Sequence, residues 1–259
     1  QDPAVSIETA ARLLGMQRET GTSSAGLPDA GLLWLHDDTG CSMLVDVGAM
    51  GPDHLAGHGH ADALSINLWD KQGAFLVDPG VVTYRAGYWR DWFRGTAAHN
   101  TLVVDGQDQC CFWGPFRVGR PPSVTLRHAK ASTVDAEHDG YQNLPDPVTH
   151  RRCILRLDHG CFEIRDRVEG SGLHDFALIF QLAENTIVTT TDLEATGVRS
   201  DGHRLHFRFE APGVDARCIV EDGWNAVGWN QKKAAPRLVV RWKSTAPTII
   251  RSHLRVEGS

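Results

Sequence analysis

The chain has 259 residues, a formal net charge of −6 and 41% apolar side chains. This composition is typical of a folded globular protein and argues against disorder. The negative charge offers no general attraction for nucleic acid or for an anionic membrane surface. No stretch approaches the roughly 20 apolar residues that a spanning helix needs, so the sequence predicts no membrane span.

The first residues lack an initiator Met and the basic and apolar regions of a signal peptide. We therefore expect the chain to begin after processing or within a longer protein. Helix signals are confined to this start, where Ser6 can cap a short helix whose residues Ile7, Ala10 and Leu14 share an apolar face.

The rest of the chain predicts strands, several of which alternate polar and apolar residues as a half-buried strand does. About a dozen strands at roughly ten-residue spacing, with almost no helix between them, predict an all-β fold, a large antiparallel β-sandwich. Asp166 falls on the apolar side of its strand, so we expect it to be a paired structural carboxylate. The clearest strands cover residues 32–35, 43–47, 64–68, 75–78, 101–105, 162–168, 204–210 and 237–242.

Six cysteines show no CxxC zinc pattern, and the chain is long enough to fold without disulfides. We expect mainly buried free thiols, with one or two disulfides as the alternative.

Candidate metal ligands gather between residues 54 and 109. His58 and His60 point to the same face of an extended segment, about 7 Å apart along the backbone. Asp78 ends an apolar strand before a Pro-Gly turn, and His99 precedes another strand. Two imidazoles and a carboxylate from three strands can form a three-ligand zinc set that leaves the fourth position to water. The alternative is a group of unrelated surface or core histidines.

Two familiar metal patterns fail on missing residues. The HxHxDH motif of metallo-β-lactamases needs a second His after Asp62, where this chain has Ala63. The cupin pattern needs a Glu where this chain has Leu64 and Ser65.

A longer series of motifs follows along the chain. They are His58-Gly-His60-Ala-Asp62, Leu76-Val-Asp78-Pro-Gly80, Trp92-Phe-Arg94 through His99-Asn100-Thr101, Val104-Asp105-Gly through Gln109, Glu137-His138-Asp-Gly-Tyr141, His150-Arg151-Arg152 and Asp166-Arg167-Val168. This series resembles the C-terminal β-sheet half of the heparinase II/III-like family of polysaccharide lyases, which includes alginate lyases. The resemblance covers roughly residues 28–185, with the motifs in the family's order.

The resemblance implies cleavage of a uronic-acid polysaccharide by β-elimination. A base removes the C5 proton of the uronate, its carboxylate is neutralised, and the C4 oxygen leaves. Carried onto this sequence, the family pattern makes His58 the histidine that faces the substrate cleft. It makes His60, Asp78 and His99 the ligands of a Zn²⁺ ion that organises the site.

The same resemblance implies that a helical α/α-toroid domain precedes this chain and supplies the main catalytic groups. Residues 1–17 would be the tail of that domain, and residues 18–259 the β-sandwich domain. Tyr84 is the candidate base within this chain, with a merely packed aromatic as the alternative. The family also favours a periplasmic or secreted location. The surface that would contact the missing domain is exposed in this chain and prone to self-association, so a homo-oligomer is possible.

Arginines and aromatic residues flank the metal motif in this otherwise acidic chain. Arg can bind a carboxylate or sulfate with two hydrogen bonds, and aromatic faces can stack on sugar rings. We therefore expect Arg94, Arg90, Trp92 and Asn100 to contact an anionic uronic-acid polysaccharide. The alternative for the arginines is pairing with nearby acidic residues. For the whole protein, the alternative is a non-catalytic carbohydrate-binding or exopolysaccharide-export module.

Overall fold

The computed structural model describes residues 26–52 and 56–258. The helix expected within residues 1–17, and the boundary expected at residue 18, lie outside the described residues. None of the described helices is long and apolar enough to cross a membrane.

Five short strands form the first sheet, in the order β1-β2-β3-β4-β5. The second, third and fourth of them bury every second side chain, which is the alternation that their sequences show. The strands are β1 (Gly26–Leu27), β2 (Leu32–His36), β3 (Ser42–Asp46), β4 (Ile66–Trp69) and β5 (Ala74–Leu76).

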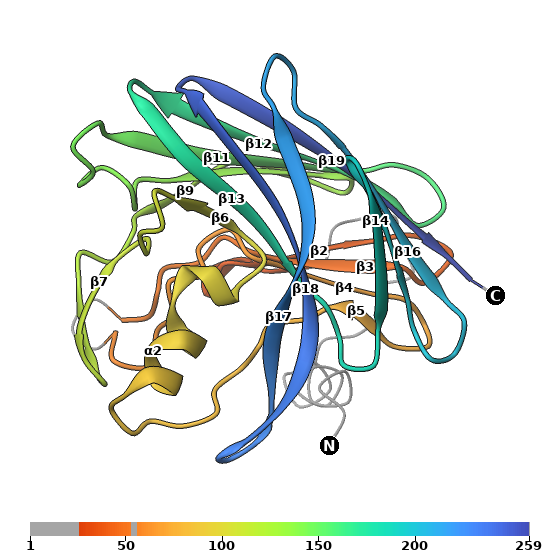
Figure 1. Cartoon of the computed structure of the whole chain (residues 1–259), viewed down its shortest axis with the longest axis horizontal. Helices are drawn as coiled ribbons and strands as arrows, with labels where there is room; N and C mark the ends of the chain where they lie inside the picture. Colours follow the sequence, from red (N-terminus) through yellow and green to blue (C-terminus); the bar gives the residue numbers. More distant parts are fainter. Residues whose placement is uncertain (1–25, 53–55, 259) are drawn as a thin grey trace.

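Eight strands form the largest sheet, in the order β14-β15-β16-β19-β12-β11-β10-β9. In Figure 1 this sheet curves above β2–β5. Its strands are β9 (Val124–Lys130), β10 (Thr133–His138), β11 (Val148–Arg156), β12 (Cys161–Gly170), β14 (Ile187–Thr191), β15 (Glu194–Val198), β16 (Arg204–Glu210) and β19 (Thr248–Glu257).

A third sheet has the order β17-β18-β13-β6, and a two-stranded sheet pairs β7 with β8. One α-helix, α2 (Tyr88–Arg94), and the 3-10 helices η1 (Pro28–Ala30) and η2 (Thr96–Ala98) complete the described elements. The remaining strands are β6 (Leu102–Val104), β7 (Cys111–Gly114), β8 (Arg117–Gly119), β13 (Leu173–Gln181), β17 (Ala216–Gly228) and β18 (Gln231–Thr245).

The three larger sheets share one apolar core. A single buried cluster joins residues such as Leu35 of the first sheet, Ile164 of the largest sheet and Leu178 of the third. Every strand pair is antiparallel, as in Phe176 opposite Trp242. The predicted large antiparallel β-sandwich is therefore confirmed, with more strands than the sequence indicated.

Two smaller predictions can also be compared with the structure. All six cysteines are free, as expected, although only Cys41, Cys110 and Cys218 are buried. Asp166 is fully buried and paired with Arg152 and His150, so the prediction of a paired structural carboxylate is confirmed.

Candidate functional site

The loop between β3 and β4 carries His58 and His60 on opposite sides of a glycine. His58 is exposed, whereas His60 is buried. Gly59 lies against Met50, and a Cβ atom at this position would come within 2.4 Å of the Met50 carbonyl oxygen. Only a glycine fits such a close approach of two backbone segments. One imidazole therefore faces outward and the other inward. The prediction that both point to the same face is wrong, because residues 57 and 58 form a turn and the segment is not an extended strand.

His99 and Asp78 meet behind this loop. Asp78 follows β5 and His99 follows η2, and His99 Nδ1 lies 2.7 Å from Asp78 Oδ2. His99 is completely buried, whereas the Asp78 side chain is 39% exposed. His99 Nε2 is buried and has no hydrogen-bond partner among the described groups. The rings of His60 and His99 are 5.2 Å apart.

Asp62 joins the two histidines. His60, Asp62 and His99 each offer one ligand atom, and these atoms lie within 4.8 Å of one another. Asp62 lies in the His58-Gly-His60-Ala-Asp62 motif, but sequence reasoning did not include it among the candidate ligands and assigned the carboxylate to Asp78. The set of His60, Asp78 and His99 stays a prediction, and Asp62 is a further candidate.

The pKa values of the two buried histidines are shifted in opposite directions. Burial, aided by the charge of His99, lowers the pKa of His60 to about 3, so this ring is neutral at neutral pH. Burial also lowers the pKa of His99, but the charge and hydrogen bond of Asp78 outweigh it and raise the pKa to about 9.

The two carboxylates also differ. Burial raises the pKa of Asp62 to about 7. Burial has the same effect on Asp78, but His99 outweighs it and brings the pKa of Asp78 to about 2. The site thus combines a neutral imidazole, an ion pair and a carboxyl group that loses its proton near neutral pH.

An aromatic surface surrounds His58. The His58 ring makes edge contacts with Tyr84 at 5.1 Å and Phe116 at 5.8 Å between centroids. Tyr84 also contacts Trp229, at 5.5 Å, and Trp229 and Phe116 are largely exposed. Trp229 lies in the turn between β17 and β18, about 145 positions after Tyr84, so no local sequence signal pointed to it.

The predicted arginines point inward. Arg90 is 1% exposed and donates to the carbonyl oxygens of Pro115 and Gly57, each at 3.1 Å. Arg94 is 2% exposed and donates to the Gly114 carbonyl at 2.8 Å and to Asp91 at 2.7 Å. These contacts hold loops together around the site. Direct contact of either arginine with a substrate stays a prediction.

Asn100 is buried, and its amide bonds three backbone groups: the carbonyls of Ile66 and Val77 and the Gln181 N–H. Its side chain joins β4, the end of β5 and β13, so substrate contact at Asn100 again stays a prediction.

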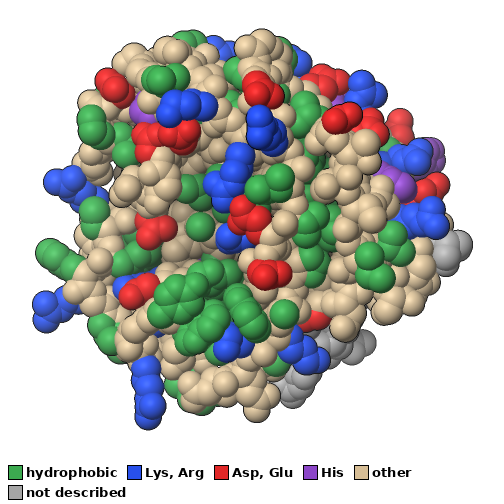
Figure 2. All heavy atoms as spheres, in the orientation of Figure 1, with side chains coloured by type: hydrophobic (Ala, Val, Ile, Leu, Met, Phe, Trp, Pro, Cys, Tyr) green, Lys and Arg blue, Asp and Glu red, His purple; other side chains and the backbone are tan. Residues whose placement is uncertain are grey.

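Trp92 is half-buried, and its ring centroid lies 6.5 Å from that of Trp89. Trp89 in turn packs on Trp224 of β17. Figure 2 shows hydrophobic side chains gathered on the face over α2 and β17.

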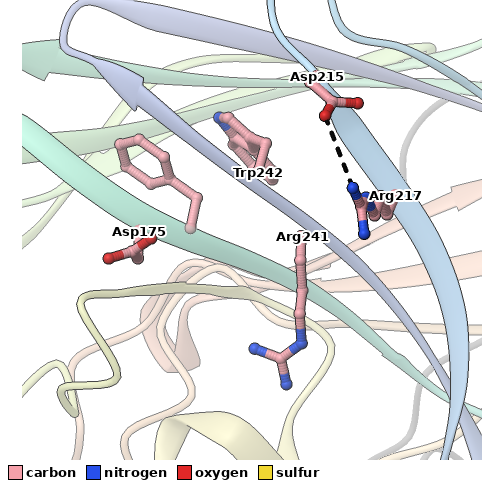
Figure 3. A pocket seen from close by; sticks show the side chains of 6 residues that line it. Asp175, Asp215, Arg217, Arg241 and Trp242 are labelled. Atoms are coloured by element: carbon pink, nitrogen blue, oxygen red, sulfur yellow. Dashed lines mark ion pairs between the residues drawn. The ribbon is translucent and has the colours of Figure 1, made fainter.

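Two shallow hollows can be described on the surface formed by residues 26–52 and 56–258. One is lined by Arg94, Asp91, Asp108 and residues of β7, close to the predicted substrate contacts. The other lies over β13, β17 and β18, where Figure 3 shows Asp215 paired with Arg217. The distance between Asp215 Oδ2 and Arg217 Nη2 is 3.9 Å. None of the predicted site residues lines this second hollow.

Comparison with known proteins identifies the family. Residues 19–253 match the model of the heparinase II/III-like C-terminal domain. The chain is a β-sandwich domain of the type that accompanies polysaccharide lyases, and it belongs to this heparinase II/III-like family.

Characterised relatives are similar over about half of the chain. A heparin-sulfate lyase from Bacteroides thetaiotaomicron is 28% identical over 144 residues, which is 52% of this chain and 19% of the relative. An alginate lyase from Stenotrophomonas maltophilia is 30% identical over 155 residues, 54% of this chain and 20% of the relative. The chain therefore corresponds to only a minor part of these longer enzymes.

Solved structures share the fold over nearly the whole chain. The heparan sulfate lyase of Pedobacter heparinus aligns with a TM-score of 0.75 at 18% identity, covering 98% of this chain and 41% of that one. A heparinase III structure aligns with a TM-score of 0.72 at 21% identity, covering 89% and 36%. At these identities the likeness establishes the fold.

Proposed function

We propose that this chain is the C-terminal domain of a lyase that cleaves a uronic-acid polysaccharide by β-elimination. Family membership carries this proposal, together with the exposed His58 beside Tyr84 in an aromatic surface. Tyr84, Phe116 and Trp229 provide faces on which sugar rings can stack. His58 lies among them, with its imidazole open to a substrate.

His58 and Tyr84 can act on a proton at the sugar ring, since both are partly open to solvent and lie in contact. General acid–base catalysis by such groups contributes about 10²–10⁴-fold in rate. A further requirement is neutralisation of the uronate carboxylate, because the C5 proton is only weakly acidic and charge develops next to it. Arg90 and Arg94 are held by backbone carbonyls and by Asp91, so we assign the neutralising group to the preceding domain.

We further propose a zinc ion held by His60 and His99 with one carboxylate. The residues fit such an ion: His60 is a neutral imidazole, and His99 Nε2 is buried without a partner. The sequence pattern assigns the carboxylate to Asp78. The geometry offers Asp62 instead, with Asp78 orienting His99 through Nδ1, as carboxylates commonly do behind a metal-bound histidine. Zinc would supply a crosslink between the loops that carry these residues.

Metal analysis of single variants tests this site. We expect about one zinc per chain, lost in His60→Ala and His99→Ala and retained in His58→Ala, which serves as the control. Loss of zinc in Asp78→Asn but not in Asp62→Asn assigns the ligand to Asp78, and the reverse assigns it to Asp62. Protein purified without chelator that contains no metal would contradict the zinc proposal.

Ultraviolet absorbance of unsaturated sugar ends tests the lyase proposal. A protein extended upstream should release such ends from uronic-acid polymers, whereas the 259-residue chain alone should not. Absence of one charge-stabilising group typically lowers the rate about 10²–10³-fold. Binding of polymer without cleavage by the extended protein would favour the non-catalytic module. Equal cleavage by both proteins would show that this chain holds the full machinery and would make Tyr84 the main candidate for the base.

A further inference from the structure

Three sequence motifs that the site does not use converge on one buried polar network. They contribute His138 at the end of β10, His150 and Arg152 on β11, and Asp166 on β12, all at most 1% exposed. Buried polar groups of this kind are costly unless they are fully bonded, so a network of four in an apolar core requires an explanation.

The network runs in one direction from β10 to β12. The Gly140 N–H donates to His138 Nδ1 at 3.1 Å, which leaves the proton of neutral His138 on Nε2. His138 Nε2 donates to His150 Nδ1 at 3.1 Å, and His150 Nε2 donates to Asp166 Oδ1 at 2.8 Å. Arg152 Nε donates to the same oxygen at 2.7 Å.

Arg152 extends the network to the candidate site. Its Nη1 atom donates to the carbonyl oxygens of Leu64 and Asn100, both at 2.7 Å. Leu64 ends the loop that carries His60 and Asp62, and Asn100 directly follows His99. One guanidinium therefore joins the two segments that bring the candidate ligands together.

Gln109 forms a second connection to the same loop. Its Oε1 accepts the Ala63 N–H at 2.9 Å, and its Nε2 donates to the Ala63 carbonyl at 3.2 Å. The same Nε2 lies 3.3 Å from His138 Nε2, but both nitrogens carry hydrogen, so this contact is not a hydrogen bond. Leu64, next along the chain, has a φ of +61°, an unfavourable conformation for a leucine. A backbone in this conformation persists where its surroundings hold it, as Gln109 and Arg152 do here.

We propose that Arg152, held by Asp166, and Gln109 are positioning residues that fix the spacing between the His60–Asp62 loop and the His99 segment. This inference rests on the proposed function, because the two segments whose spacing is fixed carry the proposed zinc ligands. Neither residue reaches solvent, so neither can touch a polysaccharide. Their effect on the site comes through the backbone groups that they bond.

The pairing of Arg152 with Asp166 supports a mechanical role over an electrostatic one. Burial raises the pKa of Asp166, but the charge of Arg152 and the contacts with His150 outweigh it and hold the pKa below its usual value. Burial lowers the pKa of His138 and His150, so both rings are neutral at neutral pH. The network consequently carries one positive and one negative charge that offset each other.

The test uses charge-balanced removal of the guanidinium. The double variant Arg152→Met/Asp166→Asn leaves no unpaired buried charge, and Gln109→Met removes the second connection independently. Arg151→Met is the matched control, because Arg151 is the neighbouring residue on β11 and pairs with Asp135 near the surface. All three changes are made in the 259-residue chain.

Amide hydrogen exchange on metal-free protein measures the positioning directly. We expect exchange of the Ala63 and Leu64 amides to rise at least about tenfold in the double variant and in Gln109→Met. Amides of β16, in the largest sheet but away from the site, should keep their wild-type rates. Arg151→Met should change neither set. Equal acceleration everywhere, or none at Ala63 and Leu64, would overturn the inference.

Zinc titration then connects positioning with the proposed site. Loss of groups that orient metal ligands typically lowers metal affinity about 10–100-fold, and we expect a loss of this size in the double variant but not in Arg151→Met. Unchanged zinc affinity would overturn the inference. Wild-type protein that binds no zinc but shows the expected exchange pattern would refute the metal proposal and leave the positioning role supported.

Discussion

Replacing Arg90 with methionine separates a loop-holding role from direct substrate contact. The change removes hydrogen bonds to the Pro115 and Gly57 carbonyls and the contact of the guanidinium with the Tyr84 ring at 4.9 Å. A hydrogen bond from a charged group contributes about 1.5–3 kcal/mol to stability. Two such bonds amount to about 3–6 kcal/mol, and the buried methionine offsets part of this loss through its apolar contacts. We expect a net loss of about 3 kcal/mol.

Thermal unfolding and chemical denaturation of the metal-free chain measure this loss. A change of 1 kcal/mol shifts the Tm of a domain this large by about 2–4 °C, so the expected decrease is about 6–12 °C. Arg85→Met is the control, since Arg85 is an exposed arginine only five positions away. Surface substitutions of this kind usually change stability by less than about 0.5 kcal/mol.

The two roles of Arg90 predict different results. If Arg90 holds the loop, Arg90→Met lowers the free energy of unfolding of the chain, and the affinity of the extended protein for polymer decreases as a consequence. If Arg90→Met unfolds like Arg85→Met while the extended protein loses affinity for the polymer, the loop-holding role is refuted. Direct contact of Arg90 with the substrate, as the sequence predicts, would then be established.

Further changes test the close backbone approach and the buried histidines. Gly59→Ala should destabilise the chain by about 1–3 kcal/mol, as overpacking does, because its Cβ would meet the Met50 carbonyl; Gly119→Ala, with no atom nearer than 3.8 Å, is the control for this denaturation measurement. The contribution of the two histidines to stability should have a maximum near pH 6.5 in metal-free protein, and it is measured as the difference in unfolding free energy between wild type and His60→Gln or His99→Gln at each pH. This difference is needed because Asp62, with its pKa near 7, titrates over the same range and opposes His60 below pH 7. The His60 contribution should fall below pH 6.5, because the folded state keeps His60 neutral, with a pKa near 3, whereas the unfolded state binds the proton. The His99 contribution should fall as pH rises from 6.5 to about 9, because its pairing with Asp78 is favourable only while His99 is protonated. A difference that does not vary between pH 5 and 9 in either variant would contradict the corresponding shift.

The sequence predicted the fold because its strands have a period that only a half-buried sheet satisfies. The alternation in residues 204–210 reappears as the alternating burial of β16. Asp166 was placed correctly for the same reason, since its parity along the strand put it on the apolar face. Which face of a sheet a side chain occupies depends on its position along its own strand, so it can be predicted from the sequence of that strand alone.

The inward direction of Arg90 and Arg94 could not be predicted in this way. Both lie on α2, a helix of seven residues that is too short for a periodic pattern to show which side faces the core. Apart from Asp91, which pairs with Arg94, their partners are backbone carbonyls distant in the sequence. Every residue has such a carbonyl, so the sequence does not show which one an arginine will bond. The contact between Trp229 and Tyr84 could not be predicted from the sequence either, because it depends on where the turn of the long β17–β18 hairpin lies in the folded protein.

The arrangement behind His60 and His99 explains why motifs so far apart in the sequence belong together. The loop that carries His60 includes Leu64 at a φ of +61°, and the segment that carries His99 follows the 3-10 helix η2. Neither segment is a strand, so no regular ladder of hydrogen bonds between them fixes their separation. Strands β11 and β12 form a regular antiparallel ladder in which Arg152 lies opposite Asp166. Because Asp166 orients the guanidinium, Arg152 can present one nitrogen to Leu64 and Asn100 together. Through Arg152 the largest sheet is thus hydrogen-bonded to two irregular segments, one of which carries His58 and His60 and the other His99.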